Sequence, residues 1–432
     1  MNNEQVKPKP KQNPIIISQG SYGCIFRPGY MCDGKGMTTN KYITKIQKNT
    51  KVSNRETAIG KKIQKIPNYQ EYYAPVLKSC NVSLSTISEK EVDKCKIITN
   101  KSADTTTSAL KYESNKLRYV GKNSILKHLL NVYNKRPSGI VRTVVESHRA
   151  LLNGFEKLSD AGIVHFDVKE NNIICDDNTG IPIIIDFGVS IDVTNISKND
   201  YRDAFYVYGV DYGPWCLEIA MISYAANKIG VAEVKTENLL SLVGLGKEAE
   251  MKEWQDQLVE KTQIDEIIAG HFSKNHAVNE LLSESQRAEY RRKVDTYYAT
   301  FIGKKWIDMV NEMQKSMLTW DNYGLSVVYL YAIETLNLSE EKNISSLLLP
   351  KYKQYLEEIM MSLPNERPSC DETRVRLKEI FGNIKRREKD RMNKGILKAS
   401  NNKDNKEEVN QQVLLSIHNT LLREQAIYKP LM

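Results

Sequence analysis

The sequence lacks the features that mark exported, membrane-spanning and zinc-binding proteins. No apolar run reaches the roughly 18 residues that a membrane-crossing helix needs, and residues 1–14 carry lysine and proline in place of the apolar core of a signal peptide. The seven cysteines are scattered, odd in number and never spaced as C-x-x-C. This pattern predicts no zinc site, no disulfide framework and a reducing compartment. We therefore expect an intracellular, cytoplasmic protein without a membrane span.

The chain has only a mild excess of positive charge. Lys and Arg number 62 against 53 Asp and Glu, which gives a net charge of +9. Such an excess favours acidic partners without indicating nucleic-acid binding by itself. Residues 384–432 form a basic tail that opens with Lys385-Arg386-Arg387 and contains a candidate amphipathic helix. The tail is a candidate contact for an acidic surface or a nucleic acid, and a solvated charged segment is the alternative.

Apolar patterning predicts a small β-rich part followed by a large helical part. Residues 1–14 have too little apolar surface to offset the entropy of ordering, so they form a predicted disordered basic arm. Periodicity and turn residues predict strands at 15–17, 25–26, 41–47, 73–78, 96–99 and 116–120, and helices at 53–66 and 147–160. Residues from about 226 to 316 form a predicted helical block, and a separate helical domain is the alternative reading.

Two short segments combine the residue types that phosphoryl transfer requires. Residues 165–172 read His-Phe-Asp-Val-Lys-Glu-Asn-Asn, and residues 186–188 read Asp-Phe-Gly. Because the phosphoryl group passes through a loose transition state, catalysis depends mainly on positioning and charge neutralisation. Asp167 can accept a hydroxyl proton, and Lys169 can reach the γ-phosphate. Asn172 and Asp186 can hold Mg²⁺. The alternative is that the two segments are an ordinary loop and strand, with His165 a buried core histidine.

Together, these segments resemble the catalytic loop and metal-binding triplet of eukaryotic-type serine/threonine protein kinases. The resemblance covers roughly 15–381 and implies an α+β, two-lobed kinase-like fold. Residues 15–120 would be the N-lobe and 121–383 the C-lobe, with the helical block at about 226–316 as an insertion. It implies transfer of the ATP γ-phosphate, with Mg²⁺, to Ser/Thr hydroxyls of protein substrates. The composition is also similar to that of divergent kinases of large DNA viruses, which implies a host cytoplasm or virion location.

The resemblance also implies a nucleotide site in the β-rich part. Lys45 is similar to the lysine that pairs with the α- and β-phosphates, with Lys41 and Lys48 as competing candidates. Glu56 is the expected carboxylate partner of this lysine, although Ser53 and Glu56 also fit a capping box at a helix start. The residues expected to contact the nucleotide are Ile17, Ser18, Gly20, Ser21, Tyr22, Gly23, Ile25, Ile43, Lys45, Ile174 and Asp186. Plain core packing is the alternative for Ile174.

Three more residues match framework positions of the family. Asp321 is expected to bond the backbone of the catalytic loop, and Arg367 is expected to pair with Glu218 as a buried ion pair.

Several departures from the family pattern support an alternative function, a pseudokinase that acts as a binding or scaffolding module. Ser18 replaces the first glycine of the glycine-rich loop, and Ile43 stands where a small alanine is usual. Gly60 lies inside the helix that must hold Glu56, at a cost of about 1 kcal/mol relative to alanine. The residues that precede Glu218 also differ from the usual alanine and proline.

Overall fold

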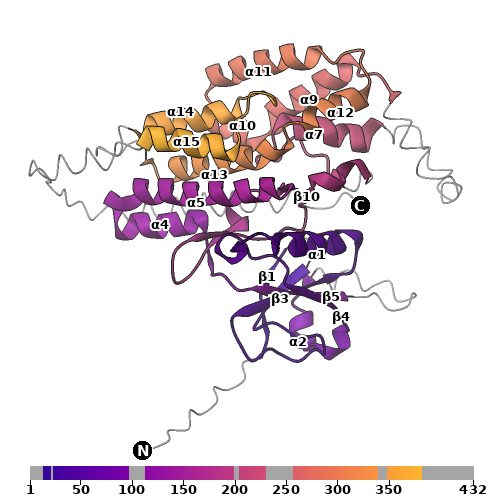
Figure 1. Cartoon of the computed structure of the whole chain (residues 1–432), viewed down its shortest axis with the longest axis vertical. Helices are drawn as coiled ribbons and strands as arrows, with labels where there is room; N and C mark the ends of the chain where they lie inside the picture. The colour runs from indigo at the N-terminus through magenta and orange to yellow at the C-terminus, as the bar shows by residue number, and fades with distance from the viewer. Residues whose placement is uncertain are drawn as a thin grey trace, which may run out of the picture. The chain divides into compact units, whose positions relative to one another are not determined.

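The computed structural model describes residues 13–20, 23–96, 112–198, 204–229, 256–338 and 348–381, and its fold class is α+β (Figure 1). The chain divides into two compact units. Among the described residues, the first contains those up to Gly121 together with Ile185–Val189, and the second contains Lys122–Ile184 and those from Ser190 to Phe381. Several predicted features lie outside the described residues: the arm up to residue 12, Ser21 and Tyr22, strand residues 97–99, block residues 230–255 and the tail 384–432.

The first unit is built on a five-stranded antiparallel sheet with the spatial order β1-β2-β3-β5-β4. Its strands are β1 (Ile15–Gln19), β2 (Gly23–Arg27), β3 (Tyr42–Lys48), β4 (Lys78–Val82) and β5 (Tyr112–Arg118). The strands predicted at 15–17, 25–26 and 41–47 are confirmed. The strand predicted at 73–78 is wrong, because β4 begins only at Lys78. Pro75 lies in the mispredicted stretch, and proline lacks the amide hydrogen that a sheet ladder needs.

Helix α1 (Lys51–Ile63) begins at a capping box that the sequence analysis did not identify. Thr50 is the N-cap and exchanges hydrogen bonds with Ser53, so the capping role considered for Glu56 is wrong. Gly60 lets the helix pack closely, because a Cβ at this position would lie 2.6 Å from the Val76 carbonyl oxygen. The glycine counted as a departure from the family pattern is therefore required by packing.

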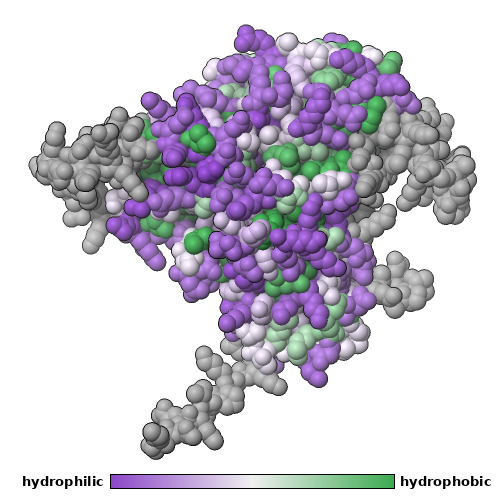
Figure 2. Space-filling view, in the orientation of Figure 1, coloured by the Kyte–Doolittle hydropathy of each residue, from purple (hydrophilic) through white to green (hydrophobic). Residues whose placement is uncertain are grey.

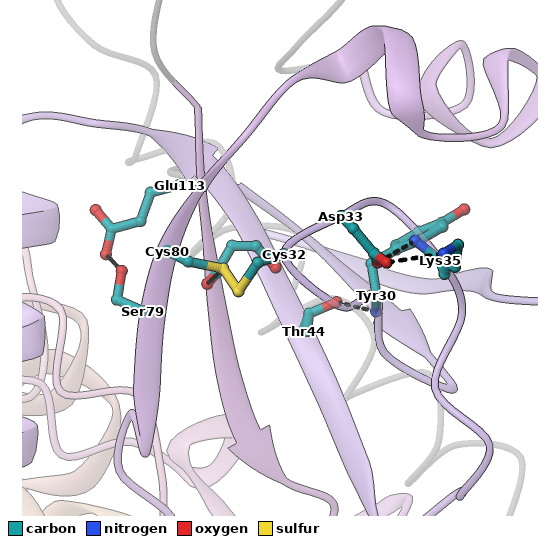
Figure 3. Close-up of a disulfide and its surroundings, with 9 residues drawn as sticks. Tyr30, Cys32, Asp33, Lys35, Thr44, Ser79, Cys80 and Glu113 are labelled. Atoms are coloured by element: carbon teal, nitrogen blue, oxygen red, sulfur yellow. Dashed lines mark hydrogen bonds and ion pairs between the residues drawn. A yellow bond between two sulfur atoms is a disulfide. The ribbon is translucent and has the colours of Figure 1, made fainter.

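Two disulfides link strands and connections of the first unit, so the prediction of no disulfide framework is wrong. Cys24 of β2 bonds to Cys95, and Cys32 bonds to Cys80 of β4 (Figure 3). The bonded pairs are 71 and 48 residues apart in sequence, which explains why short-range spacing showed no pairing. Disulfides persist in oxidising surroundings, so the expectation of a reducing compartment loses its support. The other cysteines are free and buried: Cys175, Cys216 and Cys370.

A second short helix completes the first unit. Helix α2 (Glu89–Val92) precedes Cys95, and its Glu91 carboxylate accepts a hydrogen bond from the Ile16 amide of β1 at 2.9 Å. The apolar core under this side of the sheet contains Phe26, Ile46 and the Cys24–Cys95 disulfide. The segment that ends at Cys95 is therefore joined to the sheet by both a hydrogen bond and a covalent bond.

The second unit is mainly helical, with two small sheets that support its loops. Strands β6 (Asn123–Ser124), β8 (Ile173–Cys175) and β9 (Pro182–Ile184) form one sheet, and β7 (Ile163–Val164) pairs with β10 (Ile191–Asp192). Its helices are α4 (Ile125–Lys135), α5 (Ile140–Asp160), α7 (Leu217–Tyr224), α9 (Lys261–Lys274), α10 (His276–Leu281), α11 (Glu284–Ala299), α12 (Trp306–Gln314), α13 (Trp320–Thr335), α14 (Leu349–Met360) and α15 (Cys370–Phe381).

Helix α5 leads the chain into the segment that contains His165 and Asp167. The helix predicted at 147–160 ends where α5 ends but begins earlier, at Ile140. Its predicted apolar face is buried: Leu151, Leu152, Phe155 and Leu158. The helix packs against α4, α13 and α15 (Figure 1). Burial of this face fixes the point where the chain turns toward β7 and the loop that follows it.

The predicted helical block contains helices α9 to α12 in its described part, all in the second unit. Helices α9 and α12 pack against α7, and α10 and α11 pack against α9. Tyr290, Val294 and Phe301 are buried as their spacing predicted. Leu258 does not belong to a helical face, because it forms a bridge with Lys305 and is 57% exposed.

The described residues include a few exposed large apolar side chains: Ile15, Ile17, Met31, Ile181, Val207, Leu258, Ile302, Leu318 and Val375. Figure 2 shows polar side chains covering most of one face of the molecule, with small apolar areas between them. In the described parts of the chain, no helix combines the length and the apolar character that a bilayer span requires.

Two buried histidines should make the stability of the second unit depend on pH. Burial lowers the pKa of His148 to about 3 and that of His271 to about 4, whereas histidine in an unfolded chain titrates near about 6.5. Because the folded values are depressed, the unfolded chain binds these protons first as the pH falls. Stability is therefore full above about pH 6.5, and each histidine should remove about 1.4 kcal/mol per pH unit below it.

Urea denaturation at several pH values between 7 and 5 measures this loss. His148→Gln should reduce the slope of the unfolding free energy against pH. His276→Gln, at a partly exposed position in α10, should leave that slope unchanged. An unfolding free energy that stays constant over this range in the wild-type protein would contradict the assignment.

Candidate active site

Lys45 lies in a buried ion-pair cluster of the first unit. Its Nζ is 3.1 Å from both carboxylate oxygens of Glu56 and 3.2 Å from Asp186 Oδ1. Burial alone would lower the pKa of Lys45, but the Asp186 and Glu56 carboxylates outweigh this effect and raise it above its usual value. The ammonium is therefore charged and held by two carboxylates. Neither competing lysine lies as deep, because Lys41 is exposed and Lys48 is partly exposed.

Gln47 is a partner of this cluster that the sequence analysis missed. Its Nε2 donates to Glu56 Oε2 at 3.0 Å, and both side chains are buried. Burial raises the pKa of Glu56, while Lys45 and Gln47 oppose that shift. Alternation along β3 was the available signal, since residues 45 and 47 share one face of a strand.

Close packing around Asp186 depends on Gly188. A Cβ on Gly188 would lie 3.3 Å from Asp186 Oδ1 and 3.6 Å from Lys45 Nζ. Asp186 itself has a left-handed backbone, with φ of 59°. Such a conformation is costly for a residue with a side chain and is often found at functional sites. Phe187 is buried with its ring edge-on to Tyr73, which anchors the segment.

In the second unit, Asp167 is the centre of a hydrogen-bonded group. Its Oδ2 accepts from Asn172 Nδ2 at 2.7 Å and lies 3.1 Å from Lys169 Nζ. Asn172 Nδ2 is also 2.9 Å from the Asp167 carbonyl oxygen. Tyr212 Oη donates to Asp167 Oδ1, a contact that the sequence analysis missed. The structure therefore brings together the three predicted loop residues and adds a tyrosine.

Helix α13 holds the loop that carries Asp167, as the sequence predicted for Asp321. The Asp321 carboxylate accepts from the amides of His165 at 2.7 Å and Phe166 at 3.0 Å. Burial raises the pKa of Asp321, and these donors oppose the shift. Gly324, one helical turn further on, allows close contact, because its Cβ would lie 2.9 Å from Val168 Cβ.

Phe166 is fixed in an unusual conformation next to the aspartate. Its φ is 71°, in the left-handed region. Its carbonyl oxygen accepts from Trp215 Nε1 at 2.8 Å, and its ring packs against Trp215, Phe205 and Trp320. This aromatic packing stabilises a backbone shape that presents Asp167.

The predicted buried ion pair between Arg367 and Glu218 is confirmed. Arg367 Nη1 contacts Glu218 Oε1, and neither side chain has appreciable exposure. Cys216 Sγ lies 3.6 Å from the same guanidinium nitrogen. Because Glu218 lies in the first turn of α7, the pair fixes the end of the segment that contains Tyr212.

The predicted nucleotide residues are divided between the units. The Gly20 amide donates to the Gly23 carbonyl oxygen at 2.9 Å and closes the turn between β1 and β2. A Cβ on Gly23 would lie 2.5 Å from the Ile46 carbonyl oxygen, so only glycine fits there. The remaining described residues of this set outside the Lys45 cluster are Ile17 and Ser18 on β1, Ile25 on β2, Ile43 on β3 and Ile174 on β8. All five are at least partly exposed.

The donor types of Asn172 and Asp186 fit Mg²⁺. Their oxygens are hard ligands, and the Asp186 side chain is 46% exposed. The described residues contain no group of three or more His, Cys, Asp and Glu side chains arranged for a metal ion. Mg²⁺ bound with a nucleotide commonly takes only one or two protein ligands beside phosphates and waters. Asn172 in the second unit and Asp186 in the first therefore each offer an oxygen of the type that Mg²⁺ binds.

No protein-family model matches the chain. Part of its sequence is similar to the mitogen-activated protein kinase kinase kinase MST11 of the fungus Pyricularia oryzae, with 38% identity over 91 residues. The match covers 21% of this chain and 9% of the fungal protein. This similarity suggests a protein-kinase relationship for part of the chain.

Proposed function

We propose that the protein is a serine/threonine protein kinase with a two-lobed fold, in which the first unit is the N-lobe and the second the C-lobe. The observation that carries the proposal is the group formed by Asp167, Lys169 and Asn172, three residues with the chemistry of a phosphotransfer loop. The Lys45–Glu56 ion pair supports it, because a buried lysine with an anchored ammonium is suited to bind phosphates.

Each residue has a chemical role in the proposed reaction. The acceptor hydroxyl oxygen bonds to the γ-phosphorus of ATP while the bond from that phosphorus to the β,γ-bridging oxygen breaks and ADP leaves. Asp167 accepts the hydroxyl proton, and Lys169 neutralises charge on the transferred group. Lys45 binds the α- and β-phosphates. Asn172 and Asp186 would hold Mg²⁺, which when bound neutralises phosphate charge.

One observation favours the scaffolding alternative. The Tyr212 hydroxyl bonds Asp167 Oδ1, and an acceptor hydroxyl must also approach this carboxylate. If Tyr212 blocked the carboxylate permanently, the protein would bind nucleotide without transferring phosphate.

A transfer assay separates the two functions. Wild-type protein is incubated with γ-labelled ATP, Mg²⁺ and a generic basic protein, and α-labelled ATP serves as the control. We expect Mg²⁺-dependent label on serine and threonine with the γ-label alone. Mg²⁺-dependent ATP binding in a thermal-shift assay without any transfer would support the scaffold, and the absence of both binding and transfer would contradict a nucleotide-dependent function.

A further inference from the structure

Tyr212 is a hydrogen-bond partner of Asp167 that the sequence did not predict. Its hydroxyl donates to Oδ1, while Asn172 and Lys169 contact Oδ2. The two carboxylate oxygens are therefore held from different directions. The residue is also 45 positions away from Asp167 in sequence, so no local motif contains it.

The tyrosine is anchored through both its backbone and its ring. Its carbonyl oxygen accepts from Asn275 Nδ2 at 3.1 Å and from the Trp215 amide at 3.1 Å. Its ring is edge-on to Trp215, with centroids 5.0 Å apart, and the residue is 3% exposed. Asn275 is itself 1% exposed and caps α10, accepting from the Val278 amide. These contacts hold Tyr212 in place, so it is not a mobile surface side chain.

The helical block packs closely on both sides of this tyrosine. A Cβ on Gly213 would lie 3.3 Å from Ala277 Cβ in α10. A Cβ on Gly270 of α9 would lie 3.2 Å from Val210 Cγ2. The block therefore contacts the chain at positions before and after Tyr212 as well as at its carbonyl oxygen.

We propose that Tyr212 is a positioning residue for Asp167, and that α9 and α10 contribute to the active site by holding it. A hydroxyl that donates to a carboxylate oxygen restricts the rotation of that carboxylate. Asn172 and Lys169 contact the other oxygen, so removing the phenol removes a restraint on Oδ1. This inference rests on the proposed kinase function, and it assigns a role to the helical block within it.

The direct test is Tyr212→Phe, which removes the hydroxyl and keeps the ring. We expect kcat to fall on the order of 10- to 100-fold with KM for ATP almost unchanged, since a hydrogen bond to a charged group is lost. The fall in kcat without a change in KM for ATP separates this role from a purely structural one. Tyr208→Phe is the matched control, because Tyr208 packs on Tyr224, and it should retain wild-type kinetics.

Three results would overturn the proposal. An unchanged kcat in Tyr212→Phe, with Asp167→Asn inactive, would reject the positioning role and leave the kinase function intact. An increase in kcat would identify Tyr212 as a block on the acceptor position. Phosphate on Tyr212, found by peptide mass analysis after incubation with MgATP, would identify it as an acceptor.

Asn275→Ser tests the contribution of the block. Serine preserves the capping acceptor but is too short to reach the Tyr212 carbonyl oxygen. We expect a smaller fall in kcat than for Tyr212→Phe, with KM for ATP again almost unchanged. Wild-type kinetics in this variant would reject the part of the proposal that concerns the block.

A double-mutant cycle in unfolding free energy tests the hydrogen bond without relying on activity. The cycle combines Tyr212→Phe with Asp167→Ala, and the effects of the two substitutions should be non-additive. Additive effects would contradict the positioning contact. A non-additive cycle in a protein that transfers no phosphate would preserve the contact and reject the kinase function instead.

Discussion

Asp167→Asn should reduce the rate of phosphoryl transfer by about 10²- to 10⁴-fold, the range that a positioned general base contributes. Asparagine has the shape of aspartate and can still accept from Asn172, so the loop should keep its structure. It cannot take the proton from the acceptor hydroxyl. KM for ATP should change little, because Lys45, the lysine proposed to bind phosphate, is held by its own carboxylate partners. Steady-state kinetics with γ-labelled ATP and a protein acceptor measure both parameters.

The matched control is Asp160→Asn, at the exposed end of α5, which should transfer phosphate at the wild-type rate. Equal melting temperatures would show that both variants fold. If folded Asp167→Asn transferred phosphate within twofold of the wild-type rate, Asp167 would not be the base.

Breaking the disulfides should destabilise the first unit by about 4 kcal/mol for each bond, from the entropy of closing loops of these lengths. The pairs are separated by 71 and 48 residues, so each cross-link removes many conformations from the unfolded chain. Cys24→Ala with Cys95→Ala tests the buried bond. Cys32→Ser with Cys80→Ser tests the more exposed one. Urea denaturation of each double variant, compared with the oxidised wild-type protein, measures the loss.

A variant without either bond provides the control, because adding a reductant should not destabilise it further. Alkylation of the denatured wild-type protein under non-reducing conditions should leave four cysteines unmodified. Modification of every cysteine would contradict the two bonds.

Residues that act within a short segment were predictable, because local motifs carry their chemistry. Asp167, Lys169 and Asn172 lie within one loop, and the structure joins them as their types suggested. Asp321 and Arg367 were found through resemblance to a known family, and their contacts match the expectation. The roles of the nucleotide and metal residues stay predictions.

Contacts set by topology were not predictable from local pattern. The Cys24–Cys95 bond depends on how the segment after α2 returns to the sheet. Tyr212 reaches Asp167 because aromatic packing and the helical block hold its segment. The role of Gly60 was also not predictable. The sequence shows that a glycine lowers helix stability, but it does not show that the helix packs there against the carbonyl oxygen of Val76.

The Lys45 cluster and the Asp167 group are proposed to serve one reaction, and the transfer rates of four proteins test this proposal. These are the wild type, Lys45→Met, Asp167→Asn and the double variant, all assayed with γ-labelled ATP and Mg²⁺. The effects of substitutions in groups that act as a unit are strongly non-additive. The double variant should therefore transfer phosphate about as slowly as the slower of the two single variants. Losses that multiply, or a wild-type rate for Lys45→Met, would show that the two groups do not act together in one reaction.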